Sequence, residues 1–249
     1  MSARLLAFDT STESLAVALQ GHGHGQRWHS NEPGGALASA HLLPRINALM
    51  AQAALRFDEL EAIAFGSGPG AFTGLRTSCA VAQGLGFGAG LPVIAVDSLL
   101  IVAEDARLQV AASQTNDSLD VAVAMDARMD EVYAAVYRWQ AGAWLTLQAP
   151  LLYTLPALQS SWQALRADAL AGTALAAFGP RLDLPVMRQV PEQNDRALAL
   201  LNVAQQGWRS GAAQPAADAL PLYLRDRVAQ PTVEREAARE ATRAAKAAL

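Results

Sequence analysis

The chain has 249 residues, a formal net charge of −4, 52% hydrophobic residues and a single cysteine, Cys79. This length and apolar content are enough for one large or two modest domains with a real core. The mildly acidic balance argues against a stand-alone nucleic-acid binder, and one cysteine excludes an intrachain disulfide. The sequence has neither a signal-like segment nor an apolar run of spanning length, so we expect a cytoplasmic protein with no membrane part.

The first part of the chain predicts a layered α/β domain. Strands are expected over 4–8, 14–19 and 26–30, and the glycine turn at 21–25 makes the last two an antiparallel hairpin. The apolar spacing then predicts a helix, a strand, a helix, a strand and a helix, over 38–55, 62–65, 73–89, 91–96 and 98–108. Helices that alternate with strands in this way are typical of an α/β fold.

Asp9 follows the first predicted strand directly and precedes three hydroxyl residues, Thr10, Ser11 and Thr12. An aspartate and hydroxyls at a strand end can hold a metal-bound phosphate, as they do in actin-like ATPases. The alternative, which we favour, is that these side chains satisfy the backbone of a turn. We therefore expect Asp9→Ala to leave function largely intact.

Three histidines surround the predicted hairpin turn: His22, His24 and His29. Glycines flank two of them, and such a loop does not fix the ligand geometry that zinc requires. We interpret this segment as a solvated hairpin tip with no metal.

A glycine-rich turn between a buried strand and a helix, at 66–74, is the most distinctive local feature. Gly66-x-Gly68-x-x-Ala71 fits the dinucleotide fingerprint, with Asp97 as the possible ribose-binding acid. However, Asp97 lies farther away than the roughly 20 residues expected, and Pro69 removes a donor amide. The glycines predict close approach by a phosphate or by another backbone segment.

The second part of the chain begins after a polar stretch at 109–120. Further strands are expected over 121–125, 131–137 and 144–152 and near 176–178, helices over 155–165 and 195–208, and a short extended segment over 221–225. Beyond Pro231 the chain is rich in alanine, glutamate and arginine. We predict an N-terminal domain of residues 1–108, a smaller C-terminal domain of residues 109–228, and a tail of residues 229–249.

Several motifs in the same order resemble the YeaZ-type (TsaB) family of bacterial tRNA threonylcarbamoyladenosine biosynthesis proteins. The most specific is Gly68-Pro69-Gly70-Ala71-Phe72-Thr73-Gly74-Leu75-Arg76. The others are Leu6-Ala7-Phe8-Asp9-Thr10-Ser11, His41-Leu42-Leu43-Pro44, Met125-Asp126-Ala127-Arg128-Met129-Asp130-Glu131-Val132-Tyr133 and Pro221-Leu222-Tyr223-Leu224-Arg225. The resemblance runs from the N-terminus to about Val228 and leaves the tail outside.

This resemblance implies an actin-like ATPase (ASKHA, ribonuclease H-like) fold of two related α/β domains. It also implies a part in forming N6-threonylcarbamoyladenosine at position 37 of tRNAs that read codons starting with A. In that family the protein is a non-catalytic partner with no cofactor. It pairs with the catalytic TsaD-type subunit and helps to recruit a TsaE-type ATPase. We expect this chain to meet tRNA only as part of the complex and to form a homodimer when alone.

The catalytic relative carries two metal-binding histidines, four residues apart, after the strand that corresponds to 93–96. This chain has Ser98 and Val102 there, and its four histidines all lie upstream. The missing pair argues against the first alternative, a metal-dependent transferase or hydrolase of the same fold. The distant Asp97 argues against the second, an NAD-dependent dehydrogenase using the Gly66–Ala71 loop.

Four charged residues cluster around a predicted turn: Asp126, Arg128, Asp130 and Glu131. Between two strands, such a cluster is typical of a solvated hairpin with local ion pairs, each worth about 0–1 kcal/mol. Contact with a partner is the second interpretation, and acid–base catalysis the third.

The predicted helix at 73–89 carries no charge after Arg76 and is apolar or small on every side. A helix of this kind is expected to be covered all round, by a neighbouring helix, the second domain or another molecule. We expect its small-residue stripe, with the alanine-rich side of helix 38–55, to form the interface with the catalytic partner or with a second copy. The residues assigned to it are Ala40, Asn47, Ala48, Ala51, Thr73, Thr77, Ala80, Val81, Gly84 and Gly88.

Overall fold

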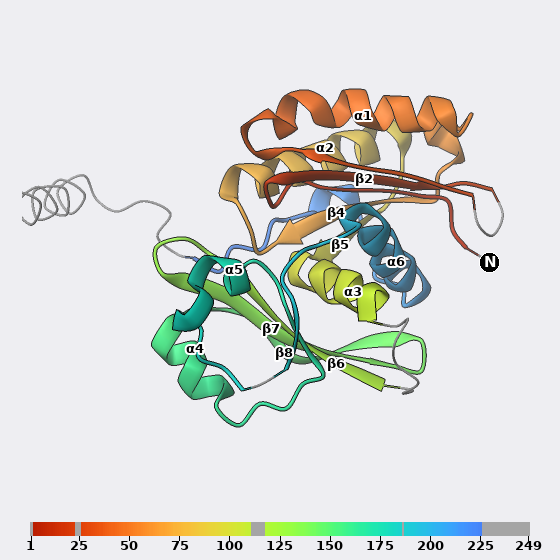
Figure 1. The fold of residues 1–249 in the computed structure, drawn as a ribbon. Helices are drawn as coiled ribbons and strands as arrows, with labels where there is room; N and C mark the ends of the chain where they lie inside the picture. Colours follow the sequence, from red (N-terminus) through yellow and green to blue (C-terminus); the bar gives the residue numbers. More distant parts are fainter. Residues whose placement is uncertain (1, 23–25, 111–117, 186, 226–249) are drawn as a thin grey trace, which may run out of the picture.

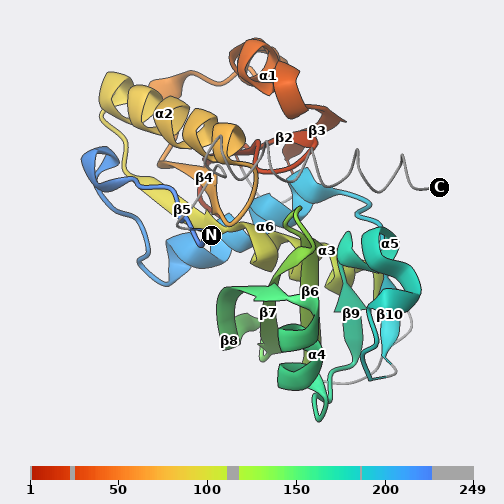
Figure 2. The ribbon, with the colours of Figure 1, turned by 90° about the vertical axis from the view of Figure 1, so that its left-hand side faces the viewer.

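The structure, a computed structural model, describes residues 2–22, 26–110, 118–185 and 187–225 (Figure 1). The predicted tail at 229–249, His24 and most of the polar stretch at 109–120 lie outside the described residues. The chain forms two five-stranded sheets, with helices between and around them (Figures 1 and 2). No helix in the described ranges is long and apolar enough to cross a membrane.

The first sheet and its helices follow the predicted order. The strands are β1 (Leu5–Asp9), β2 (Ser14–Gln20), β3 (Arg27–Pro33), β4 (Ala62–Gly68) and β5 (Val93–Asp97). The helices are α1 (Ala38–Gln52), α2 (Phe72–Ala89) and α3 (Ser98–Val110). Short 3-10 turns, η1 (Gly35–Leu37) and η2 (Phe57–Glu59), flank α1.

The second sheet is built from the following half of the chain. Its strands are β6 (Ser118–Asp126), β7 (Glu131–Gln140), β8 (Ala143–Thr154), β9 (Ala169–Ala171) and β10 (Arg188–Val190). The helices are α4 (Leu155–Trp162), α5 (Ala174–Phe178) and α6 (Arg196–Arg209), and the short turns are η4 (Gly179–Arg181) and η5 (Ala216–Asp218).

The two sheets repeat one topology. The first has the order β3-β2-β1-β4-β5 and the second the order β8-β7-β6-β9-β10. In each, the three strands of the meander are antiparallel, and the two later strands pair in parallel with the first and with each other. Helices occupy corresponding places in both halves, so the predicted two related α/β domains are confirmed.

The centre of the first sheet is covered on both faces, which explains its unbroken apolar sequence. Leu6 and Phe8 of β1 face the cluster under α1 and α2, whereas Leu5 and Ala7 face the cluster that contains α6. All four are fully buried. Strands in this position read as continuous hydrophobic runs, and for this reason the sequence predicts them well.

The helices that follow β5 and β10, α3 and α6, each pack in part on the sheet of the other half. α3 packs much of its apolar surface on the second sheet, where Leu99, Val102 and Ala103 join the same cluster as Val121 of β6. α6 packs on the first sheet and lies beside α3 between the two sheets (Figure 2). Residues 196–222 thus return to the first sheet, so the predicted boundary between domains at 108 and 109 does not follow the packing of α6.

Three local predictions were wrong. Residues 176–178, expected as a strand, lie in helix α5, and the actual strand β9 precedes them at Ala169–Ala171. Strand β10 was not predicted. Both strands have only three residues, too few for a period-two pattern to emerge. Leu43, expected in the core stripe of α1, is 45% exposed.

Candidate functional site

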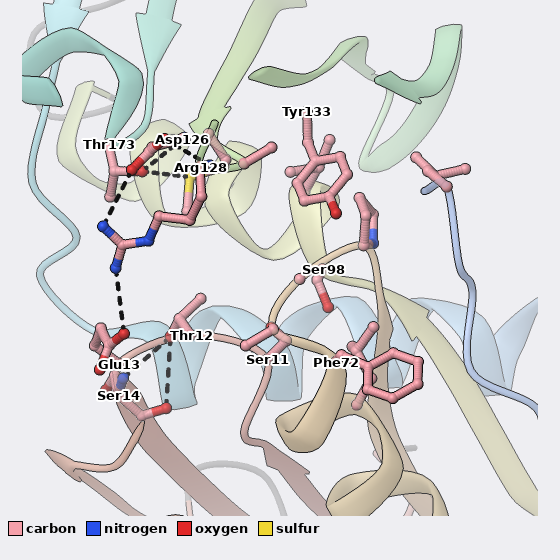
Figure 3. Close-up of a pocket in the computed structure, with 18 of the residues that line it drawn as sticks. Ser11, Thr12, Glu13, Ser14, Phe72, Ser98, Asp126, Arg128, Tyr133 and Thr173 are labelled. Carbon is pink, nitrogen blue, oxygen red and sulfur yellow. Dashed lines mark hydrogen bonds and ion pairs between the residues drawn. The ribbon is translucent and has the colours of Figure 1, made fainter. Parts of the chain in front are cut away.

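A cleft of about 790 Å³ lies between the two sheets (Figure 3). Its walls are the loops after β1 and β4, the β6–β7 turn, the first residues of α3 and α6, and residues 222–225. Ligands of open α/β sheets bind outside the carboxyl ends of the strands. A concave site of this size at that position is therefore the first candidate for a binding or active site.

The backbone of residues 10–11 of this chain packs closely against the glycine turn after β4. A Cβ on Gly74 would collide with the carbonyl oxygen of Thr10, and a Cβ on Gly70 would lie 2.5 Å from that of Ser11. Hydrogen bonds fix the approach, because Ala71 N–H donates to Ser11 O at 2.7 Å and Thr10 Oγ1 donates to Gly74 O at 2.7 Å. The space that a dinucleotide loop keeps for a pyrophosphate is filled here by residues 10–11.

A second segment, around Leu222, packs against the glycine turn at Ser67 and Gly68. Gly68 has φ +121°, which favours glycine, and a Cβ there would lie 2.6 Å from the carbonyl oxygen of Leu222. Leu222 N–H donates to Ser67 O at 2.7 Å. The 221–225 motif, predicted as an extended segment, thus lies in the cleft wall as a backbone partner of the glycine turn.

Asp9 at the end of β1 is fully buried and paired with Arg196, the first residue of α6. Arg196 Nε lies 2.6 Å from Asp9 Oδ2, and both side chains are at most 2% exposed. Ser11 donates to the same carboxylate from its amide, at 3.1 Å to Oδ1, and from its hydroxyl, at 2.9 Å to Oδ2. Arg196 also donates to Ser11 Oγ and to the Ser98 carbonyl.

These contacts favour the turn interpretation of residues 9–12. Both carboxylate oxygens of Asp9 already accept hydrogen bonds, and Oδ2 is paired with the buried Arg196 guanidinium. The turn interpretation is also supported by Thr12 Oγ1, which accepts from Ser14 N–H at 3.1 Å. The expectation that Asp9→Ala leaves function largely intact stays a prediction, and the structure adds an expected loss of stability, because the change leaves Arg196 buried without its partner.

The positions that lack histidines are used for packing. Ser98 is buried, and its Oγ accepts from Gly68 N–H at 3.1 Å. Val102 is 2% exposed within the apolar cluster between α3 and the second sheet. No group of three or more potential metal ligands occurs among the residues that the structure describes.

The β6–β7 turn carries Arg128, Met129 and Asp130, all with φ between +57° and +64°. Non-glycine residues adopt this region at a cost, so three in succession require outside support. The Arg128–Glu13 pair, at 3.5 Å, is exposed on both sides, whereas Asp126, which lies 3.4 Å from Arg128, is only 18% exposed (Figure 3).

The outside support comes from Arg225, nearly a hundred residues away in sequence. Its NH2 group donates to the carbonyl oxygens of Ala127, at 2.9 Å, and Arg128, at 3.3 Å, and pairs closely with Glu131. In the sequence, Arg225 belongs to a family motif, but no local pattern indicates its role. Its function in the structure is to fix the strained turn at the cleft.

Asp97 at the end of β5 connects the two sheets. Its Oδ2 accepts from the hydroxyl of Tyr137, on β7, at 2.5 Å, and its Oδ1 accepts from the amides of Leu99 and Leu100 at the start of α3. Burial raises the pKa of Asp97 above its usual value, against the opposing effect of these donors. Burial also raises the pKa of Tyr137, so its hydroxyl remains a donor throughout the physiological range.

This arrangement predicts a pH dependence of stability. Because the pKa of Asp97 is higher in the folded than in the unfolded state, its contribution is largest below the unfolded value of about 3.9 and declines as pH rises through the folded value. We expect the difference in free energy of unfolding, wild type minus Asp97→Asn, to fall from pH 4 to pH 7 in urea denaturation. A difference that rises with pH would contradict this.

The residues predicted to form an interface lie on α1 and α2, on the outer side of the first sheet (Figure 1). Most of them are exposed in the single chain: Ala40, Asn47, Ala51, Thr73, Ala80, Gly84 and Gly88. Ala48, Thr77 and Val81 are half-buried, and Val81 packs against the core. The exposed leucine and phenylalanine of this face, Leu43 at 45% and Phe87 at 66%, were not assigned to it from the sequence.

The sides of α2 are covered unequally. Residues after α6 cover one side, where Cys79 Sγ and Gln83 Nε2 contact the carbonyl oxygen of Ala219. Gly86 also belongs to a tight contact, since a Cβ there would lie 2.8 Å from Ala216 Cβ. Gly84 and Gly88 have nothing within 4 Å of an added Cβ, so among these three glycines of α2 only Gly86 makes a close contact within this chain.

Comparisons with known proteins match this chain to two related kinds of protein, TsaD and TsaB. A family model described as TsaD, tRNA N6-adenosine threonylcarbamoyltransferase, matches residues 36–159. The tRNA threonylcarbamoyladenosine biosynthesis protein TsaB of Escherichia coli is 32% identical over 231 residues, covering 91% of this chain and 96% of the relative. The chain belongs to the TsaB family.

Other TsaB-family proteins extend this result. TsaB of Haemophilus influenzae is 43% identical over 129 residues, 52% of this chain and 51% of that protein. The solved structure of YeaZ from Pseudomonas aeruginosa has a TM-score of 0.77 and 34% identity, and the match covers 90% of this chain and all of that one. Together with the repeated sheets, this likeness assigns the TsaB-family chain to the actin-like ATPase (ASKHA, ribonuclease H-like) fold, as predicted.

Proposed function

We propose that this chain is a non-catalytic scaffold subunit of the complex that forms N6-threonylcarbamoyladenosine at position 37 of tRNAs reading codons that start with A. It pairs with a catalytic TsaD-type subunit, helps to recruit a TsaE-type ATPase, and meets tRNA as part of that complex in the cytoplasm. The names of its relatives, tRNA threonylcarbamoyladenosine biosynthesis proteins, support the pathway.

The buried pair of Asp9 and Arg196 carries the non-catalytic part of the proposal. An aspartate at the end of the first strand is the group that would orient a metal-bound phosphate in this fold. Here a guanidinium takes the place of the cation, at 2.6 Å and at most 2% exposed. To bind Asp9, a metal ion would have to displace the Arg196 guanidinium, which has no other carboxylate partner among the described residues.

The charges of the cleft also disfavour a polyphosphate. Arg196 and Arg225 line it but are paired with Asp9 and Glu131, which leaves Arg128, among the described lining residues, as the one cation whose ion pairs are exposed. Three acidic side chains line the same space: Glu13, Asp126 and Glu192. Phosphates entering the cleft would therefore meet more negative than available positive charge.

The face of α1 and α2 supports the partner assignment. It combines small residues with two exposed large apolar side chains, Leu43 and Phe87, and carries no charged residue on α2 after Arg76. Small residues let another helix approach closely, and a contiguous patch of exposed apolar side chains is typical of an interaction site. We assign this face to the TsaD-type subunit and, in its absence, to a second copy of this chain.

We expect the purified chain to show no metal-dependent ATP turnover. Phosphate release should equal that of a buffer blank with ATP and magnesium, and should be unchanged by EDTA. Titration with NAD should likewise give no binding, because residues 10–11 fill the glycine turn. Turnover that disappears with EDTA would instead favour a metal-dependent transferase or hydrolase, and NAD binding would favour a dehydrogenase.

The pathway itself is tested in a cell whose only copy of this protein can be depleted. Depletion should lower the fraction of adenosine 37 that carries the threonylcarbamoyl group, measured by mass spectrometry of digested tRNA. Affinity purification of the chain from the native cell should recover the TsaD-type subunit. Unchanged modification after complete depletion would refute the proposed pathway.

A further inference from the structure

A second, smaller pocket of about 220 Å³ lies at the far end of the α3–α6 pair from the cleft. Arg196 at the start of α6 lines the cleft, whereas Arg209 at the end of α6 lines this pocket. The other residues that line it are Ser2, Arg27, Glu104, Arg107, Trp139, Trp144, Asn202, Gln205 and Gln206. Three arginines from three different elements, Arg27, Arg107 and Arg209, thus line the same pocket as one carboxylate, Glu104.

That carboxylate, Glu104, is 1% exposed, and its hydrogen-bonding capacity is filled. Oε2 accepts from Arg107 Nε at 2.7 Å and from Trp144 Nε1 at 2.9 Å. Oε1 accepts from Arg107 NH2 at 2.8 Å and from Asn202 Nδ2 at 2.8 Å. A carboxylate offers about four acceptor positions, so Glu104 has none left for a ligand.

The arginines are only partly neutralised. Arg107 is held in place by Glu104 and by the ring of Trp139, whose centroid lies 4.2 Å from its guanidinium carbon. Arg27 donates to two neutral amide oxygens, of Gln20 and Asn202, at 3.1 and 3.2 Å. Over the described ranges, no carboxylate pairs with Arg27 or Arg209.

Helix ends account for only part of this charge. Arg107 and Arg209 stand in the last turns of α3 and α6, where the helix dipole favours a cation. Arg27 belongs to β3, and no helix end explains its presence. The pocket retains two positive charges beyond the Glu104–Arg107 pair, in a chain whose net charge is −4.

We propose that this pocket binds a phosphate group, supplied either by the RNA backbone or by a small phosphorylated compound. Guanidinium groups match phosphate oxygens in geometry and charge, and Arg107 is already fixed by its ring and carboxylate contacts. The volume is below the usual range for a whole drug-sized ligand, which limits the bound part to a single group. None of the lining residues belongs to α1 or α2, so the pocket is separate from the proposed partner interface.

The first test uses the full chain and inorganic phosphate. Arg27→Gln/Arg209→Gln removes both cations that lack a carboxylate partner without changing Glu104. Arg166→Gln, which removes one positive charge on an exposed side chain outside the pocket, is the control for a loss of charge elsewhere. At constant ionic strength, phosphate should raise the unfolding midpoint saturably in the wild type and in Arg166→Gln, but not in the double variant. No saturable shift in the wild type, or an equal shift in the folded double variant, would overturn the proposal.

The second test distinguishes the two sources of phosphate. Binding of an unmodified tRNA to the complex of this chain with the TsaD-type subunit is measured by filter retention at several salt concentrations. If the RNA backbone supplies the group, the double variant should bind less tightly, with a salt slope smaller by about 1 for each backbone phosphate that it no longer neutralises. A phosphate response that is absent in the double variant while tRNA binding is unchanged assigns the pocket to a small phosphorylated compound.

Discussion

Replacement of Asp9 by asparagine is expected to lower the free energy of unfolding by about 3–5 kcal/mol. The asparagine keeps the shape of the side chain and can still accept from Ser11, but it leaves the Arg196 guanidinium buried without its counter-charge. Removing one partner of a buried pair is costly for this reason, even where the intact pair contributes little net stability. Urea denaturation followed by circular dichroism measures the change.

A double-mutant cycle separates the charge effect from packing. Arg196→Leu alone leaves the carboxylate unpaired, whereas Asp9→Asn/Arg196→Leu leaves neither charge, so the double variant should lose clearly less than the sum of the two single variants. Glu13→Gln is the control, because the Glu13–Arg128 pair is exposed and should contribute about 0–1 kcal/mol. An Asp9→Asn protein as stable as the wild type would contradict a structural role for the pair.

The same cycle tests the non-catalytic proposal in a cell. Loss of modified adenosine in an Asp9→Asn strain has two explanations: the protein is degraded, or the carboxylate has a chemical role. The level of the protein in the cell distinguishes them. The double variant is more informative because it restores the fold without restoring the carboxylate. Modified tRNA in a strain with Asp9→Asn/Arg196→Leu would show that the acid has no chemical task.

The sequence predicts those parts of the fold in which the pattern of apolar residues indicates which side chains are buried. Four strands of the first sheet, β1, β2, β4 and β5, appear as short apolar runs bounded by turn residues, and α1 shows apolar positions three and four residues apart. The glycines at 66–74 indicate close approach, although not by what. Local patterns cannot identify the approaching group, because the backbone of residues 10–11 and the carbonyl of Leu222 are brought there by the tertiary fold.

The arginine contacts that organise the cleft could not be derived from spacing. Arg196 lies 187 residues after Asp9, and Arg225 lies 94 residues after Glu131. One local signal does exist for Arg196. It occupies the first turn of α6, directly after the capping residue Asp195, where the helix dipole disfavours a cation. An arginine in that position indicates that an acidic partner compensates for the dipole.

The packing of α3 and α6 shows a further limit of sequence reasoning. Both helices were predicted, but their apolar residues do not say which sheet they cover. Each helix packs in part on the other half's sheet, so a boundary drawn where the sequence becomes polar separates α6 from its neighbours. Only the three-dimensional arrangement reveals that residues 196–222 complete the first domain.

Gly84→Leu is expected to disrupt assembly while leaving the fold intact. Nothing lies within 4 Å of a Cβ at this position, so the added side chain projects into open space in the single chain. Leucine is also the better helix former, by up to about 1 kcal/mol, so the free energy of unfolding should stay equal or rise. At a closely packed interface the same side chain should cost about 1–3 kcal/mol, or roughly 5–150-fold in Kd.

The measurements are analytical ultracentrifugation of the chain alone and co-purification with the TsaD-type subunit. Gly84→Ala provides a smaller step in the same direction, and its effect should be weaker than that of leucine. Gly86→Ala is the control with the opposite expected effects, because Gly86 is packed inside the chain: its Cβ would lie 2.8 Å from Ala216 Cβ and 3.1 Å from the Leu91 carbonyl oxygen. It should lower stability and leave the exposed face unchanged. A folded Gly84→Leu protein that assembles with normal affinity would place the interface away from α2, since no close helix packing over Gly84 can accept a leucine without cost.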